Sequence, residues 1–246
     1  MRIALMADIH ANRPALEACL DHARAHRADR LVFLGDYVGY GAQPNEVMER
    51  IMAEADRGAI AVAGNHDQAV ADDQESMTAD AETAMAWTRG QLGPEAREFL
   101  ANLPLRFEDG TRLYVHASPQ TYPPWTYIHD GRAAQRALEA SRAQMVFCGH
   151  THKAALHGIT ATGQLVSFEP VPSVRVPLPP HRRWLNVVAS VGQPRDGNPA
   201  AGYALLDTTA SEITHLRVPY DVQAAASAIL DAGLPPALAD RLRKGR

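Results

Sequence analysis

The stretch "RIALMADIH" (Arg2–His10) decides the fold of this chain. Its apolar run, Arg2 to Ala7, has the length of a buried strand and ends at an acid, Asp8. A helix pattern from about Pro14 to Ala25 follows, and a second short apolar run comes next at Leu31 to Leu34. We therefore predict a β-α-β start with polar side chains at the carboxyl ends of its strands, where open α/β sheets bind ligands.

The rest of the chain passes from helices to strands. Helices are predicted from Pro44 to about Ala55, at Thr78 to Gln91, at Pro94 to Ala101 and after Asp221. The predicted strands are Ala59–Ala63, a hairpin turning at Asp109 and Gly110, the run "MVFC" before Gly149, Ala155–Ile159, Gln164–Phe168, Trp184–Ala189, Tyr203–Asp207 and Glu212–Val218. The Pro-rich piece Glu169 to His181 is interpreted as a loop or edge crossing. This order favours an α/β fold of two packed sheets with helices outside, in one domain over residues 1–246.

Composition narrows the class of protein. The chain has 246 residues and a net charge of −4, which gives no general attraction for nucleic acid or an anionic membrane surface. Its two cysteines, Cys19 and Cys148, have no CxxC spacing and fit a reducing compartment. The apolar run before Asp8 is too short for a signal peptide core or a membrane span. We expect a soluble cytoplasmic protein.

Five short motifs stand directly after apolar runs. They are "DIH" (Asp8, His10), "GDYVGYG" (Gly35–Gly41), "GNHD" (Gly64–Asp67), "VHAS" (His116) and "GHTH" (Gly149–His152). Their side chains offer imidazole, carboxylate and amide groups, a set that suits Mn, Fe, Zn, Ni or Co better than Mg or Ca. The other histidines are assigned to the surface or to core packing: His22, His26, His129, His157, His181 and His215.

The ordered set D-x-H, G-D, G-N-H-D, H and G-H-x-H resembles the calcineurin-like metallophosphoesterases, from Met1 to about Asp207. The stretches "GYGAQPNEV" and "SVGQPRDGNP" are similar to a bacterial phosphodiesterase-type branch of that family. The resemblance implies a four-layer α-β-β-α sandwich of two mixed sheets that holds two metal ions. That fold agrees with the two sheets inferred above.

The resemblance also implies a role for each motif residue. Two divalent transition-metal ions are expected, with Mn first and Fe, Zn, Ni or Co as alternatives. The first metal would be held by Asp8, His10 and His152, the second by Asn65, His116 and His150, and Asp36 would bridge both. A metal-bridging hydroxide would attack phosphorus. The resemblance places His66 near the leaving-group oxygen, as general acid.

The substrate side departs from one branch of the superfamily. Protein Ser/Thr phosphatases carry G-D-x-V-D-R-G, and Gly39 and Tyr40 stand here in place of the second Asp and the Arg. Asp67 is then a candidate to orient His66. Arg195 is the candidate cation that binds the phosphate, although it could equally pair with Asp196 or another carboxylate.

The remaining substrate contacts are aromatic. Tyr40 is a candidate contact, and "YPPWTY" (Tyr122–Tyr127) either stacks on a nucleobase or aryl group or pins its own loop to the core.

The leading hypothesis is a metal-dependent hydrolase of a small phosphodiester, for example a cyclic nucleotide. The alternatives are a phosphomonoesterase or protein phosphatase, and a non-enzymatic interaction module on the same fold. The expected partner is a small phosphoester substrate, with no stable nucleic-acid complex and no membrane association. The sequence leaves the oligomeric state open.

Overall fold

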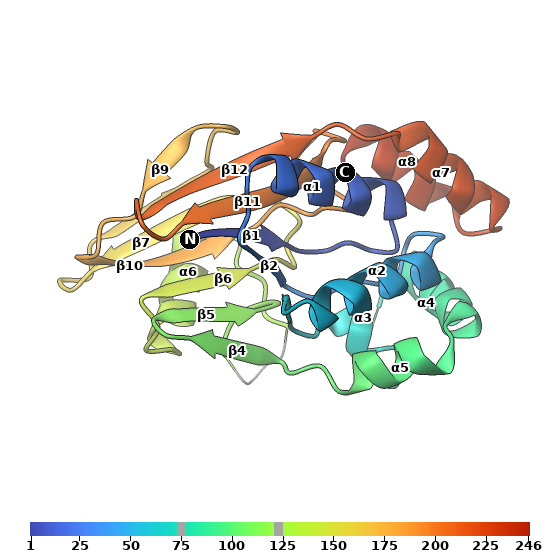
Figure 1. The fold of residues 1–246 in the computed structure, drawn as a ribbon, viewed down its shortest axis with the longest axis horizontal. Helices are drawn as coiled ribbons and strands as arrows, with labels where there is room; N and C mark the ends of the chain where they lie inside the picture. The colour runs from blue at the N-terminus through green and yellow to red at the C-terminus, as the bar shows by residue number, and fades with distance from the viewer. Residues whose placement is uncertain (73–76, 121–124) are drawn as a thin grey trace.

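The N-terminal apolar run forms a central strand of the first of two six-stranded sheets. A computed structural model describes residues 1–72, 77–120 and 125–246 (Figure 1). The strands of the first sheet, in order across it, are β3 (Ile60–Ala61), β2 (Arg30–Phe33), β1 (Arg2–Met6), β11 (Ala201–Asp207), β12 (Glu212–Val218) and β9 (Arg175–Pro177). Strand β1 pairs in parallel with β2 and antiparallel with β11, so the sheet is mixed.

The second sheet is also mixed and holds the hairpin predicted around Asp109 and Gly110. Its strands, in order, are β4 (Arg106–Asp109), β5 (Arg112–Val115), β6 (Met145–Cys148), β10 (Arg182–Val187), β7 (Ala155–Thr160) and β8 (Leu165–Phe168). Strands β5, β6 and β10 run in parallel, so their carboxyl ends meet at one edge of the sheet.

The helices form the outer layers. They are α1 (Arg13–Ala25), α2 (Pro44–Asp56), α3 (Asn65–Gln68), α4 (Ala79–Gln91), α5 (Pro94–Ala101), α6 (Gly131–Glu139), α7 (Val222–Asp231) and α8 (Pro236–Lys244). Helices α1 and α2 pack on the outer face of the first sheet, and α6 packs on the outer face of the second. Among the described residues, the helices lack the combined length and hydropathy that a membrane-spanning segment needs.

Successive side chains of β1 point to opposite faces of the first sheet, so this strand contacts both the second sheet and the outer helices. Ile3 and Leu5 face the core between the two sheets, whereas Ala4 and Met6 face α1 and α2. Both faces of β1 are buried from Ile3 to Met6, which is why these four residues are all apolar. The four-layer α-β-β-α sandwich of two mixed sheets is confirmed.

Besides the short helix α3, three features differ from the elements predicted from sequence. The Pro-rich segment contains β9, which pairs with the edge of β12. Helix α6 has no predicted counterpart, although the Asp130 side chain caps it by accepting a 2.8 Å hydrogen bond from the Ala133 N–H. The single helix predicted after Asp221 is a pair, α7 and α8, that packs against the Tyr40 side of the sandwich.

Candidate metal centre and active site

The motif residues lie where strands of both sheets end. Asp8 and His10 follow β1, Asp36 follows β2, Asn65 follows β3, His116 follows β5, and His150 and His152 follow β6. All except Asn65, which is half-buried, are buried. Because the two sheets pack face to face, residues far apart in sequence meet at one end of the sandwich.

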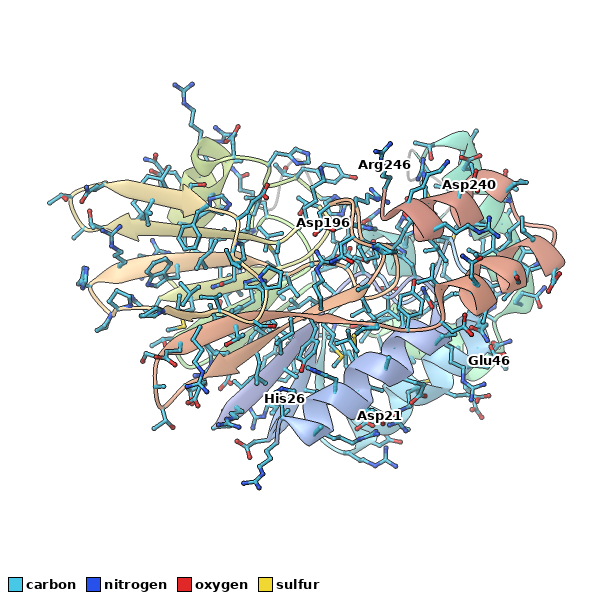
Figure 2. All side chains as sticks on the ribbon, turned by 90° about the horizontal axis from the view of Figure 1, so that it is seen from above. Asp21, His26, Glu46, Asp196, Asp240 and Arg246 are labelled. Atoms are coloured by element: carbon cyan, nitrogen blue, oxygen red, sulfur yellow. The ribbon has the colours of Figure 1, made fainter. Side chains whose placement is uncertain are left out.

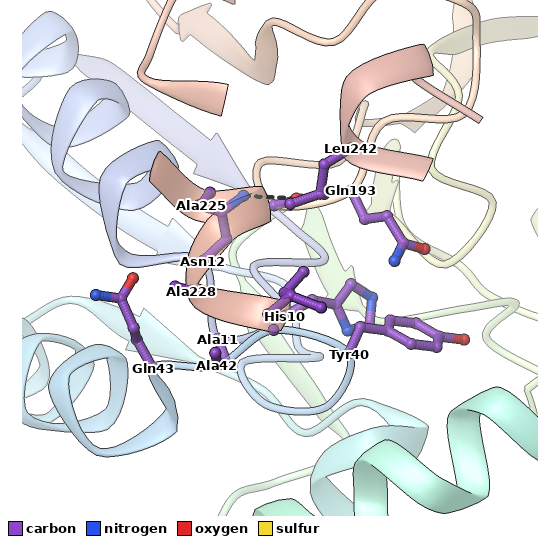
Figure 3. A pocket seen from close by; sticks show the side chains of 13 residues that line it. His10, Ala11, Asn12, Tyr40, Ala42, Gln43, Gln193, Ala225, Ala228 and Leu242 are labelled. Atoms are coloured by element: carbon purple, nitrogen blue, oxygen red, sulfur yellow. Dashed lines mark hydrogen bonds between the residues drawn. The ribbon is translucent and has the colours of Figure 1, made fainter. Parts of the chain in front are cut away.

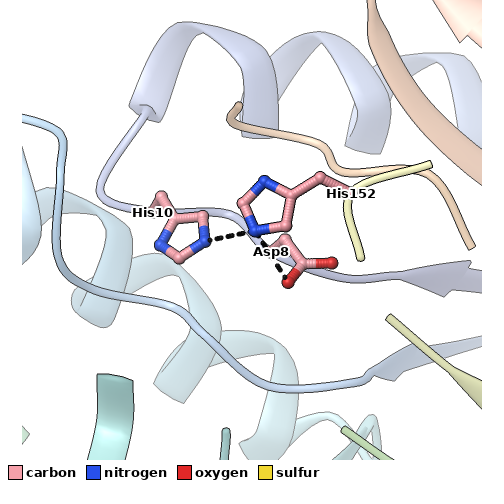
Figure 4. Close-up of side chains that lie close together, drawn as sticks. All are labelled: Asp8, His10 and His152. Atoms are coloured by element: carbon pink, nitrogen blue, oxygen red, sulfur yellow. Dashed lines mark hydrogen bonds and ion pairs between the residues drawn. The ribbon is translucent and has the colours of Figure 1, made fainter. Parts of the chain in front are cut away.

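Asp8, His10 and His152 form the first group, drawn in Figure 4. The Nε2 atoms of His10 and His152 lie 3.2 Å apart, and His152 Nε2 lies 3.4 Å from Asp8 Oδ1. The Asp8 carboxylate also accepts hydrogen bonds of 3.0 and 3.1 Å from the His150 N–H, which fixes its orientation. Three potential donor atoms thus point at one buried place.

Asp36, His116 and His150 form the second group. His116 Nε2 lies 3.1 Å from His150 Nδ1 and 3.2 Å from Asp36 Oδ2. The same Asp36 Oδ2 lies 3.7 Å from His10 Nε2, so this one oxygen stands between the two groups. Asn65 Oδ1 is buried and has no hydrogen-bond partner among the described residues. An orphaned acceptor in such a place suits a metal ligand, because an unpaired buried polar atom is otherwise costly.

Backbone carbonyl groups orient three of the imidazoles. His10 Nδ1 lies 3.1 Å from the Val38 carbonyl oxygen. His116 Nδ1 lies 2.7 Å from that of Leu34, and His152 Nδ1 lies 2.6 Å from that of Gln193. A proton held on Nδ1 by such a bond leaves the Nε2 lone pair free for a metal, as in known metal-binding histidines.

The loops that carry these residues are locally strained. Five of the candidate metal ligands have positive φ angles: Asp8 (54°), His10 (48°), Asp36 (57°), His150 (68°) and His152 (59°). Such angles are uncommon for residues other than glycine and concentrate at functional sites. Gly149 allows a close approach of two loops, because a Cβ there would lie 2.5 Å from Asp8 Oδ2. The strain fits loops shaped for the site rather than for chain stability.

The electrostatics of the centre favour positive charge between its carboxylates. Burial lowers the pKa of His10 and His152 well below the usual range, so both are neutral, as metal ligands must be. Burial opposes charging of His116, yet the Asp36 and Asp8 carboxylates raise its pKa to about 9. Burial also opposes ionisation of Asp36, but His116 and its neighbours hold the pKa of Asp36 well below its usual range. These carboxylates attract a positive charge, either a proton on His116 or a bound cation.

His66 lies beside the two groups. Its ring centroid is 4.8 Å from that of His10 and 4.6 Å from that of Tyr40. The backbone N–H of His66 donates a 2.9 Å hydrogen bond to Asp36 Oδ1. Its Nδ1 atom has no hydrogen-bond partner among the described residues. Burial, with help from His116, lowers the pKa of His66 against the opposing effect of Asp36. One donor atom from each of His66, His10 and Asp36 lies within 4.8 Å of the others.

The Asp67 carboxylate hydrogen-bonds to the backbone. Asp67 Oδ2 accepts 2.8 Å hydrogen bonds from the N–H groups of Asp36 and Gly64, and Oδ1 accepts a 2.9 Å bond from that of Tyr37. It therefore ties the loop after β2 to the loop after β3. Its contacts give no support to the hypothesis that it orients the His66 ring, whose neighbours are aromatic.

Arg195 and Tyr40 meet at the side of the centre. The Arg195 guanidinium carbon lies 5.7 Å from the centroid of the Tyr40 ring. Asp196, the alternative partner predicted for Arg195, instead forms an ion pair with Arg217. The Arg195 guanidinium hydrogen-bonds to Gln193 Oε1, a contact that sequence reasoning missed although Gln193 stands in the quoted "SVGQPRDGNP".

The aromatic segment is only partly described, since Tyr122 to Pro124 lie outside the described residues. Tyr127 stacks on the His150 ring with centroids 4.0 Å apart, and His129 stacks on Tyr127 at 5.0 Å. Trp125 meets the His116 ring edge to face at 5.7 Å. Trp125 and Tyr127 therefore lie against the rings of the candidate ligands His116 and His150.

Comparisons with known proteins agree with this arrangement. A model of the calcineurin-like phosphoesterase superfamily domain matches residues 1–211. An uncharacterized protein of Methanocaldococcus jannaschii is 32% identical over 250 residues, covering 99% of this chain and 98% of the relative. The crystal structure of a metallophosphoesterase from Sphaerobacter thermophilus is 36% identical with a TM-score of 0.87, covering 100% of this chain and 99% of that one. A hypothetical protein from Pyrococcus horikoshii shares the fold at 20% identity, with a TM-score of 0.79 and coverage of 100% and 98%.

Proposed function

This chain belongs to the calcineurin-like phosphoesterase superfamily, and on that premise we propose that it is a dinuclear-metal hydrolase of a small phosphodiester. The observation that carries the proposal is the pair of buried donor groups, Asp8–His10–His152 and Asp36–His116–His150, with one oxygen of Asp36 standing between them. A shared carboxylate between two donor sets is the arrangement expected for two adjacent cations.

The residues present fit such a centre. One divalent ion would be held by His10, His152 and Asp8. The other would be held by His116, His150 and Asn65, and Asp36 would bind both ions. Imidazole, carboxylate and amide donors suit Mn, which we propose first, as well as Fe, Zn, Ni or Co. When bound, the two ions would supply an activated water and neutralise charge on the phosphate.

His66 would donate the proton that the leaving oxygen needs. Its backbone hydrogen bond to Asp36 keeps the ring beside both donor groups. The negative charge of a phosphate placed next to the ring favours protonation, which opposes the effect of burial on the pKa of His66. General-acid catalysis of this kind contributes about 10² to 10⁴ in rate.

Arg195 and Tyr40 would receive the substrate. A guanidinium can bond two phosphate oxygens at once, and the Tyr40 ring backs it. The loop of Tyr40 packs against α7 and α8, which gives this side of the site a fixed wall. We propose a small diester rather than a phosphoprotein because Gly39 and Tyr40 replace the Asp and Arg of the protein phosphatase motif.

The test compares two substrates on one preparation. The protein is purified without added metal, reloaded with Mn, and assayed with a bis-aryl phosphodiester and an aryl phosphomonoester. We expect metal-dependent turnover that favours the diester. Preference for the monoester would assign a phosphomonoesterase instead. Turnover of neither, with two metals bound per chain, would contradict an enzymatic function and favour the interaction module.

A further inference from the structure

Gln193 is a buried residue whose main chain and side chain form hydrogen bonds with different neighbours. It is 1% exposed, lies in the loop between β10 and β11, and lines the pocket drawn in Figure 3. Its N–H donates a 2.8 Å hydrogen bond to Ser190 Oγ, and its carbonyl oxygen lies 2.6 Å from His152 Nδ1. Both of these contacts use backbone atoms, so they do not depend on the Gln193 side chain.

The side chain instead holds Arg195. Gln193 Oε1 accepts hydrogen bonds from Arg195 Nη2 at 2.9 Å and from Arg195 Nε at 3.3 Å. Two bonds from one planar guanidinium fix both its position and its orientation. In that orientation the guanidinium lies over the Tyr40 ring, which itself contacts the rings of His10 and His66.

The backbone on both sides of Arg195 is anchored separately. The Arg195 N–H donates to the His152 carbonyl oxygen at 3.3 Å, and the Gly197 N–H donates to the Gly245 carbonyl oxygen at 2.8 Å. Asp196 pairs with Arg217. Figure 2 shows this face, with Asp196 on the loop and Arg246 at the chain end. Since other contacts secure the loop, the Gln193 side chain is left to set the direction of the Arg195 side chain.

The side chain that holds Arg195 is a carboxamide and not a carboxylate. A structural arginine is commonly paired with a carboxylate, which cancels its charge. Arg195 forms no ion pair with a carboxylate among the described residues, and its side-chain partner is a neutral carboxamide. A carboxamide fixes the guanidinium but leaves its full positive charge for an anion.

We propose that Gln193 is a positioning residue that holds Arg195, with its charge uncancelled, for the phosphate group of the substrate. The inference rests on the proposed function and deepens it, because it names the device by which this site recognises a phosphate.

The experiment is a double-mutant cycle read by phosphate binding. Inorganic phosphate is titrated calorimetrically into the Mn-loaded protein for Gln193→Met, Gln193→Glu and Arg195→Met, and for both Gln193 variants combined with Arg195→Met. Methionine keeps the length of the side chain without the acceptor, and glutamate keeps the acceptor but cancels the charge. Gln135→Met on α6 is the matched control, and metal content is measured throughout.

Arg195→Met is expected to weaken phosphate binding about tenfold or more, as the loss of a charge-assisted hydrogen bond does. Gln193→Met should weaken it several-fold, and Gln193→Glu at least as much. In the Arg195→Met background Gln193→Met should not shift affinity more than about twofold, because the partner is gone. Gln193→Glu should still weaken binding there, because its carboxylate repels phosphate. In steady-state assays the Gln193 variants should raise KM more than they lower kcat.

Equal effects of Gln193→Met in both backgrounds would overturn the proposal, as would wild-type affinity in Gln193→Glu. A failure of this proposal can be distinguished from a failure of the proposed function. A wild-type protein that binds phosphate but hydrolyses no ester would contradict the function alone, and the cycle would still decide the role of Gln193. A wild-type protein that binds two Mn ions and no phosphate would overturn both.

Discussion

His66 is held by packing rather than by an acidic partner. The rings of His10 and Tyr40 contact it from two directions at tilted or perpendicular angles, and its backbone N–H is fixed by Asp36. The ring therefore has a defined place, although the Asp67 carboxylate does not hold it. That carboxylate accepts three hydrogen bonds from backbone N–H groups instead. Such packing can place a general acid without fixing its charge, which the bound substrate then determines.

Replacing His66 by Ala should reduce turnover according to the leaving group. For a diester with an alkyl leaving group, which must be protonated, we expect a loss of about 10² to 10⁴, and a much smaller loss for a nitrophenyl leaving group. Metal content should stay at the wild-type value. His157→Gln, at a buried histidine on β7, is the matched control. Equal losses for both leaving groups, or loss of metal, would show that His66 is structural or a ligand.

Gly39 makes room for the His66 ring. It has a φ of 83°, and a Cβ atom at this position would overlap His66 Nδ1. Gly39→Ala should therefore lower kcat/KM without removing any functional group. Gly90→Ala in α4, where the added Cβ meets open space, should leave kcat/KM unchanged and stabilise the fold by roughly 1 kcal/mol. Full activity of Gly39→Ala would contradict the placement of His66.

Strand β12 carries a buried histidine that makes stability depend on pH. His215 is 3% exposed, both ring nitrogens lack partners among the described residues, and burial lowers its pKa from 6.5 to about 4. The unfolded chain takes up a proton where the folded chain does not, so stability is full above pH 6.5 and falls as the pH drops toward 4.

From pH 7 to pH 5 this residue should cost the wild type roughly 2 kcal/mol of unfolding free energy. His215→Leu should lose that part of the dependence. Urea unfolding of both proteins at pH 7 and pH 5 measures this dependence. Subtracting the change in the variant from the change in the wild type removes the contribution of the other titratable groups. Identical pH dependence in the two proteins would refute the assignment.

At the scale of elements, strong local patterns predicted most of the fold. Buried strands such as β1 and β6 are short apolar runs, and the hairpin at Asp109 and Gly110 has a turn signal between its strands. The missed elements lack such signals. Strand β9 exists through its pairing with β12, which local sequence does not encode, and α6 is rich in charged and small residues.

At the scale of the whole molecule, the centre joins the two sheets. Asp8, His10 and Asp36 come from the first sheet, and His116, His150 and His152 come from the second. Their convergence could be predicted because parallel strands end at a common edge. The contacts of Gln193 with Arg195, of Asp67 with three amides and of Tyr127 with His150 could not, because each depends on how separate loops fold against one another.

The central claim is that this centre works with two metal ions. The most direct measurement titrates Mn into metal-free protein and follows both bound metal and hydrolysis of the bis-aryl phosphodiester. We predict that the rate rises until two ions are bound per chain and then levels off. A rate that is complete with one ion bound, or absent with two, would contradict the account.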